Sequence, residues 1–100
     1  MILEICANSY QSAVNAEIAG AHRIELCSEI SVGGTTPSYG LLKKVMADID
    51  IPVHVLIRPR SGNFTYSDKE FDIMKENIRL CKDLNCAGIV SGVLHEDNTI

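Results

Sequence analysis

The chain has 100 residues, of which 46% are hydrophobic, and a formal net charge of -4 at pH 7. This length allows one domain at most, and an acidic chain without a basic run excludes nucleic acid and anionic membranes as expected partners. No stretch approaches the ~20 apolar residues that a transmembrane helix needs.

The first residues also argue against export. Residues 1–4 contain neither a basic region nor the small-residue cleavage site of a secretory signal. The four cysteines show no CxxC or zinc-finger spacing, so reduced thiols in the cytoplasm are the simplest interpretation. We therefore expect a cytoplasmic protein, and the composition leaves open whether the full-length form is a homo-oligomer.

The first part of the chain predicts a strand, a helix and a second strand. Asn8 or Ser9 can cap the helix, which is expected to bury Val14 and Ile18 on one side. Gly20 ends it, since glycine is favoured just past a helix C-terminus. The expected elements are a strand over residues 2–6, a helix over about 10–19 and a strand over 23–27.

Two further helices and two further strands follow. Thr36 can cap the second helix and Pro37 suits its first position, while Ser67 and Glu70 have the spacing of a capping box before the third helix. That third helix is expected to bury Phe71, Met74, Ile78 and Cys81. The expected strands cover residues 53–57 and about 88–93.

This alternation predicts an α/β fold with a parallel sheet, in the order (βα)3β4. Four parallel strands would leave open edges and one uncovered face. A complete TIM (β/α)8-barrel typically needs ~250 residues. We therefore expect residues 1–100 to form the N-terminal half of a single TIM-barrel domain, and the chain to be a fragment.

Alternation along the strands also predicts which side chains face the barrel interior. The aliphatic residues of each strand, beginning with Leu3 and Ile5, should pack on the helices. In a barrel the carboxyl ends of the strands form the active-site mouth, whereas Arg23 lies at the opposite end and should be structural. The side of Ser91 is not fixed by the sequence. The expected interior set is Glu4, Cys6, Arg23, Glu25, Cys27, His54, Leu56 and Arg58.

The interior acids are candidates for catalysis. Glu4 and Glu25 could act as acid and base groups or as ligands of a divalent metal, with His54 as a proton shuttle tuned near neutrality. The alternative is a structural network of ion pairs with Arg58, His54 or Arg23, because buried carboxylates are rare unless they are paired. We favour the functional interpretation.

The arginines that follow the third strand have different expected roles. Arg58 is expected to pair with an anionic ligand or a buried carboxylate, since a planar guanidinium suits both. For Arg60 we expect a surface ion pair. The glycine-rich loop over residues 33–38 leads into a helix N-terminus and offers an anion site, although its glycines could serve only the turn.

The cysteines divide into two pairs. Cys6 and Cys27 end neighbouring strands, and two thiols at equivalent heights could share a soft ion such as Cu(I). The alternative is that they pack as small apolar groups, as free cysteines commonly do. Cys81, on the buried face of the third helix, and Cys86, in the following turn, are expected to be structural.

Several segments of the sequence together resemble the copper homeostasis protein CutC family. The matching segments, in this numbering, are residues 3–6, 20–28, 33–38, 51–60 and 66–68. The resemblance is collinear over essentially the whole chain but covers only the N-terminal half of a family member. It implies a TIM barrel, a cytoplasmic location and a role in copper handling, with Cys6 and Cys27 matching the family's proposed Cu(I) ligands.

The chain departs from the family pattern at several positions. His22 replaces a common acidic residue, and Ser91 stands where a larger apolar residue is usual. The loop after Arg60 is also altered, at Ser61, Asn63 and Thr65. We therefore keep two functional hypotheses: a Cu(I)-binding protein using Cys6 and Cys27, and a TIM-barrel enzyme acting on a small anionic metabolite through Glu4, Glu25, His54 and Arg58.

Overall fold

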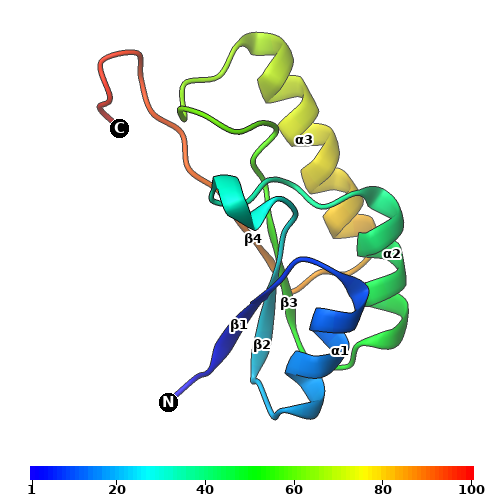
Figure 1. Cartoon of the computed structure of the whole chain (residues 1–100). Helices are drawn as coiled ribbons and strands as arrows, with labels where there is room; N and C mark the ends of the chain where they lie inside the picture. The colour runs from blue at the N-terminus through cyan, green and yellow to red at the C-terminus, as the bar shows by residue number, and fades with distance from the viewer.

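A computed structural model describes residues 1–100 as one four-stranded sheet with its helices on a single face (Figure 1). The strands are all parallel and follow the chain order β1-β2-β3-β4. The predicted α/β alternation is confirmed. The elements are β1 (Glu4–Ala7), α1 (Tyr10–Ile18), β2 (Arg23–Leu26), the short 3-10 helix η1 (Ile30–Val32), α2 (Tyr39–Asp48), β3 (Val53–Leu56), α3 (Asp68–Asp83) and β4 (Gly88–Val90).

The hydrophobic core lies between the sheet and the helices. Alternate strand residues such as Ile24, Leu26 and Val55 are fully buried there, and each such side chain stabilises the fold by about 1.5–3 kcal/mol. On the other face, Glu25 and His54 are only half-buried, since no helix covers that side (Figure 1). The predicted alternation of strand side chains between the two faces of the sheet is confirmed, except that Leu3 precedes β1 and is exposed.

Helix α1 meets the sheet through smaller side chains than expected. Ser9 is its N-cap, and Ser12 completes the capping box. Ala13 and Ala16 are buried, whereas Ile18 is 79% exposed, so the prediction that Ile18 is buried was wrong. The side chains of Ala13 and Ala16 share one face, and their small size lets the helix approach the sheet closely.

Helix α2 begins two residues later than the sequence indicated. Its N-cap is Ser38, whose Oγ accepts a hydrogen bond from the backbone N–H of Leu41 at 3.2 Å. Thr36 does not cap the helix because its Oγ1 accepts the backbone N–H of Arg58 at 2.8 Å. Pro37 is buried and lies before the helix. The hydroxyl of Thr36, which the sequence indicated as the cap, therefore connects the loop to the end of β3 instead.

Helix α3 follows the predicted capping box and buries a narrower stripe than expected. Met74 and Cys81 are buried, and Phe71 packs partly against the core. Ile78 is 37% exposed, which corrects its assignment to the buried set. No helix is long and apolar enough to cross a membrane.

The register of β4 fixes the orientation that the sequence left open. His54 stands opposite Gly88 and Leu56 opposite Val90, so Gly88 and Val90 share the interior face. The strand ends at Val90, three residues before its expected end. Ser91 is rotated to the other side, and its Oγ donates to the carbonyl oxygen of Ile57 at 3.1 Å. Ser91 thus extends the β3–β4 pairing by a side-chain bond.

We expect Ser67→Ala to destabilise the full-length protein by about 1 kcal/mol, the usual effect of losing an N-cap. Ser67 Oγ accepts from the backbone N–H of Glu70, and Glu70 Oε1 accepts in return from the N–H of Ser67. Urea denaturation measures the change. The control is Ser61→Ala, since Ser61 is exposed and its hydroxyl forms no hydrogen bond. Equal midpoints for both variants would contradict the capping role.

Candidate functional site

The interior side chains of the sheet form rows that run across the strands. One row contains Cys6 on β1, Glu25 on β2, His54 on β3 and Gly88 on β4, each directly opposite the next. Three of the predicted site residues therefore share one level of the interior face. Their side chains nevertheless have different partners.

Cys6 and Glu25 are in contact. The Sγ of Cys6 lies 3.9 Å from Oε2 of Glu25, to which it donates a weak hydrogen bond. Burial raises the pKa of the Cys6 thiol above its ordinary value, and the carboxylates of Glu25 and Glu4 raise it further. At neutral pH Cys6 is therefore a thiol rather than a thiolate, and Glu25 is the nearest proton acceptor.

Cys27 lies further along the barrel axis than Cys6. The register pairs Cys6 with Glu25, so Cys27 is two residues closer to the carboxyl edge, and its backbone N–H donates to the carbonyl oxygen of Ala7 at 3.0 Å. The expectation of equal heights was wrong. The two thiols are diagonal neighbours on one face, roughly 8 Å apart between Cα atoms by strand geometry.

The loop after β2 covers Cys27. A bridge between Ser28 and Thr35 folds this loop back, and Cys27 is only 4% exposed. Gly34 makes the close approach, because a Cβ there would lie 2.8 Å from Cδ2 of Leu56 and 3.8 Å from the Cys27 Sγ. Burial, then the charge that Cys6 carries once it has ionised, and then the charge of Glu25 raise the pKa of Cys27.

Glu4 is held at the amino end of the sheet. Its Oε2 accepts a hydrogen bond from Nε of Arg23 at 2.5 Å, and both side chains are partly exposed. The two residues are directly opposite in the β1–β2 register. Arg23 is structural, as predicted, and Glu4 has the ion-pair partner that the structural alternative named.

The imidazole of His54 lies over Gly88. A Cβ added to Gly88 would approach Nδ1 of His54 to 3.2 Å, so the glycine leaves room for the ring. No hydrogen bond joins His54 to Glu25, although the two residues are opposite in register. His54 is turned toward β4 and away from the two thiols, so Glu4, Glu25, His54 and Arg58 do not converge on one point.

The guanidinium of Arg58 connects two loops through hydrogen bonds to their backbone carbonyls, an arrangement that we call the Arg58 clamp. Its Nη1 donates to the carbonyl oxygens of Val32 at 2.8 Å and Gly34 at 2.7 Å, and its Nη2 donates to that of Gly62 at 2.8 Å. The ring of Phe64 lies 5.1 Å from the guanidinium carbon. Arg58 is 8% exposed and forms no ion pair, so the expected carboxylate partner is absent from this chain.

The glycine-rich loop presents oxygen atoms rather than N–H groups to this region. The backbone N–H groups of Gly33, Gly34 and Thr35 all donate within the loop, to Ile30, Glu29 and Ser28. These three N–H groups are not free to hold an anion, and the expected anion site at the N-terminus of the following helix stays a prediction. Both glycines have positive φ angles, and the turn requires them for that reason.

Arg60 organises the loop that follows. Its Nε donates to Oε2 of Glu70 at 2.5 Å in a surface ion pair, as the sequence predicted. Asn63 Oδ1 accepts from Arg60 and from the N–H of Thr65, whose carbonyl accepts from Arg60 in turn. Two of the residues that depart from the family pattern therefore belong to one loop network.

His22, a third departure, serves as an acceptor. Its Nδ1 accepts the backbone N–H of Leu3 at 2.8 Å, a role that a carboxylate could fill as well. Cys81 and Cys86 lie in and against the core, as predicted. Burial raises the pKa of Cys81 to about 12. A thiol with so high a pKa is inert at neutral pH.

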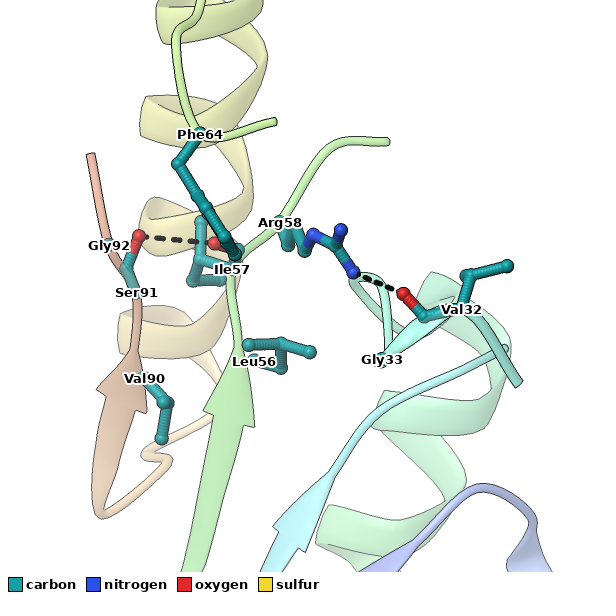
Figure 2. A pocket seen from close by; sticks show the side chains of 9 residues that line it. All are labelled: Val32, Gly33, Leu56, Ile57, Arg58, Phe64, Val90, Ser91 and Gly92. Atoms are coloured by element: carbon teal, nitrogen blue, oxygen red, sulfur yellow. Dashed lines mark hydrogen bonds between the residues drawn. The ribbon is translucent and has the colours of Figure 1, made fainter. Parts of the chain in front are cut away.

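Sequence reasoning missed Phe64 and Val32 as neighbours of Arg58. Together with the ends of β3 and β4 they line a cavity of about 360 Å³ (Figure 2). The available signal for Phe64 was a large apolar aromatic residue in a largely polar loop. No group of three or more His, Cys, Asp or Glu side chains is arranged to hold a metal. At most two such side chains of this chain can therefore share one metal ion.

Comparisons with known proteins give a consistent result. A family model described as the CutC family matches residues 1–100. The human "Copper homeostasis protein cutC homolog" is 54% identical over 99 residues, covering 99% of this chain and 36% of its own length. A family protein CutC of Enterobacter sp. (strain 638) is 52% identical over 99 residues, covering 99% of this chain and 40% of its own.

A solved structure shows the same arrangement. The crystal structure of a candidate copper homeostasis protein CutC from Streptococcus agalactiae is 41% identical and superposes with a TM-score of 0.89, covering 100% of this chain and 50% of that one. The chain therefore spans 36–40% of the length of these curated relatives and half of the crystallised chain. Its four strands correspond to the N-terminal half of a barrel.

Proposed function

Since this chain belongs to the CutC family, we propose that the full-length protein acts in copper homeostasis by binding Cu(I) as its cargo through Cys6 and Cys27. The observation that carries the proposal is the placement of two free thiols on neighbouring strands, on one face and near the carboxyl edge. Thiolates are the soft ligands that select Cu(I) over harder ions.

The surroundings of the two cysteines suit a site that is loaded and emptied. Cys6 is exposed and Cys27 is buried, so the ion can meet Cys6 first and then be drawn toward Cys27. Each thiol loses its proton when it binds the metal, and the adjacent Glu25 carboxylate, 3.9 Å from the Cys6 Sγ, can accept the proton from Cys6. The printed names of the human relative and of the Streptococcus agalactiae structure support the link to copper.

We expect Cys6→Ser/Cys27→Ser to abolish tight Cu(I) binding by the full-length protein. The loss should exceed the roughly 10–100-fold effect of removing an outer-shell partner, because both proposed ligands are removed. Competition with a colorimetric Cu(I) chelator measures the affinity. The matched control is Cys86→Ser, which removes a thiol outside the site. Equal Cu(I) affinity in the double variant and the unmodified protein would refute the proposal.

A further inference from the structure

We propose that the full-length protein also binds a small organic carboxylate with an apolar body, in the cavity beside Arg58 at the carboxyl ends of β3 and β4 (Figure 2). The volume of about 360 Å³ lies within the usual range of small-molecule sites, roughly 300–1,000 Å³. Neither Cys6 nor Cys27 lines this cavity, so the proposal is independent of Cu(I) binding.

The first support is the charge of Arg58. A guanidinium remains charged in proteins, and this one is more than nine-tenths buried and forms no ion pair. Its three acceptors are the carbonyl dipoles of the clamp, which carry no net charge. A buried charge is costly unless an opposite charge is near, and residues 1–100 supply none for Arg58.

The second support is the pair of donors that the clamp leaves unused. A guanidinium has five N–H groups, and three of them bond the carbonyls of Val32, Gly34 and Gly62. Nε is buried and has no acceptor, and one N–H of Nη2 is also free. Nε and Nη2 form one edge of the guanidinium, and two parallel donors on an edge match the two oxygens of a carboxylate.

The walls indicate the rest of the ligand. Leu56 and Val90 lie side by side on the sheet, and Phe64 adds apolar surface from a loop, whereas Val32 turns its carbonyl oxygen toward Arg58 (Figure 2). Among residues 1–100, Arg58 is the one charged residue that lines the cavity, which favours a ligand with a single negative group. At about 30 Å³ for each water molecule in the liquid, the cavity has the volume of roughly a dozen water molecules, which is enough for a small organic acid.

Phe64 is the side chain that a ligand has to move. Its ring stacks on the guanidinium at 5.1 Å and is 40% exposed, so it can rotate without disturbing the core. After rotation the ring can pack on the apolar body of the ligand. Entry therefore requires a change in one loop side chain rather than in the sheet.

Fluorine NMR titration of the full-length protein with para-fluorobenzoate tests the proposal. The neutral para-fluorobenzamide has nearly the same shape, so the comparison isolates the negative charge. We expect the benzoate to bind at least about tenfold more tightly than the amide, because charge-assisted bidentate bonds are the stronger kind. Absence of benzoate binding, or equal binding of the amide, would overturn the proposal.

Gly92→Val tests the location without disturbing the clamp. Gly92 lines the cavity, and a Cβ added there meets nothing within 4 Å, so the variant should fold while its side chain fills the space. Gly40→Val on α2 is the matched control, since its added Cβ is equally unobstructed and lies outside the cavity. We expect the first variant to lose benzoate binding and the second to retain it.

Two further measurements complete the test. Arg58→Met should abolish the preference for benzoate over the amide, and a preference that survived would overturn the role of Arg58. Inorganic phosphate should displace the benzoate only weakly, because it cannot use the apolar walls; displacement at equal concentrations would contradict the apolar part of the proposal. Unchanged benzoate binding in Cys6→Ser/Cys27→Ser would support a site separate from copper, and its loss would refute that separation.

Discussion

The Cu(I) affinity of the full-length protein should rise about a hundredfold for each unit of pH near neutrality, because two protons are released for each ion bound. The sign follows from the thiols. Burial and neighbouring carboxylates raise the pKa of Cys6, and burial, an ionised Cys6 and the charge of Glu25 raise the pKa of Cys27. Both groups are therefore protonated over this range, and lowering the pH favours release of the metal.

Competition with a Cu(I) chelator across a pH series measures this slope. A tenfold rise in affinity for each pH unit would show that only one of the two cysteines is a ligand. An affinity that does not depend on pH would contradict the proposal that thiols lose their protons on binding Cu(I). The measurement also separates the copper site from the carboxylate site. A guanidinium keeps its charge in proteins, so benzoate binding should not change with pH.

Glu25→Gln supplies the control for the electrostatic part of this prediction. The carboxylate raises the pKa of Cys6 both through its charge and through the hydrogen bond at 3.9 Å, so its loss should lower that pKa. Cu(I) binding at neutral pH should then become tighter, with about one power of ten for each unit by which the pKa falls. Glu96→Gln, at an exposed position without a partner, should have no effect. Weaker binding in Glu25→Gln would show that Glu25 is itself a ligand.

Residues 1–100 made alone should self-associate. In a closed barrel β1 lies beside the eighth strand and β4 beside the fifth, whereas here both are edges of the sheet. The uncovered face carries Cys6, Glu25 and His54 without an opposite wall. Open edges pair with other chains, and two half-barrels can partly complete each other. We expect a poorly soluble or oligomeric species without a competent copper or carboxylate site.

Size-exclusion chromatography and amide exchange test this expectation directly. Arg58 and Leu56 are less exposed than the sequence suggested, because the loop with Gly34 covers that end of the sheet. Exposure of the interior is therefore concentrated toward β1 and the middle row. A sharply monomeric species with well-protected β1 and β4 would contradict the prediction.

The sequence predicted the features that depend on local pattern. Alternation in β2 and β3 identified Ile24, Leu26 and Val55 as core residues, because each strand places every second side chain on the helix side. The capping box of Ser67 and Glu70 was visible because both partners lie within one turn. These features need no knowledge of distant contacts.

Features that depend on distant contacts could not be predicted. Cys27 is covered because the bridge between Ser28 and Thr35 folds a loop over it, and Thr36 lost its capping role to the N–H of Arg58. The acceptors of Arg58 are backbone carbonyls. Every residue has such a carbonyl, so no residue type identifies them in a sequence.

The Arg58 clamp affects how the sequences of the two loops that it connects can change during evolution. Because its acceptors belong to the backbone, the side chain at Val32 can be replaced without loss of a bond. Gly34 and Gly62 are constrained instead by their positive φ angles. Position 58 has no comparable freedom, since a lysine lacks the planar fork that reaches three oxygens in fixed directions. Sequence drift in these loops is therefore compatible with a constant shape, provided that this one arginine is retained.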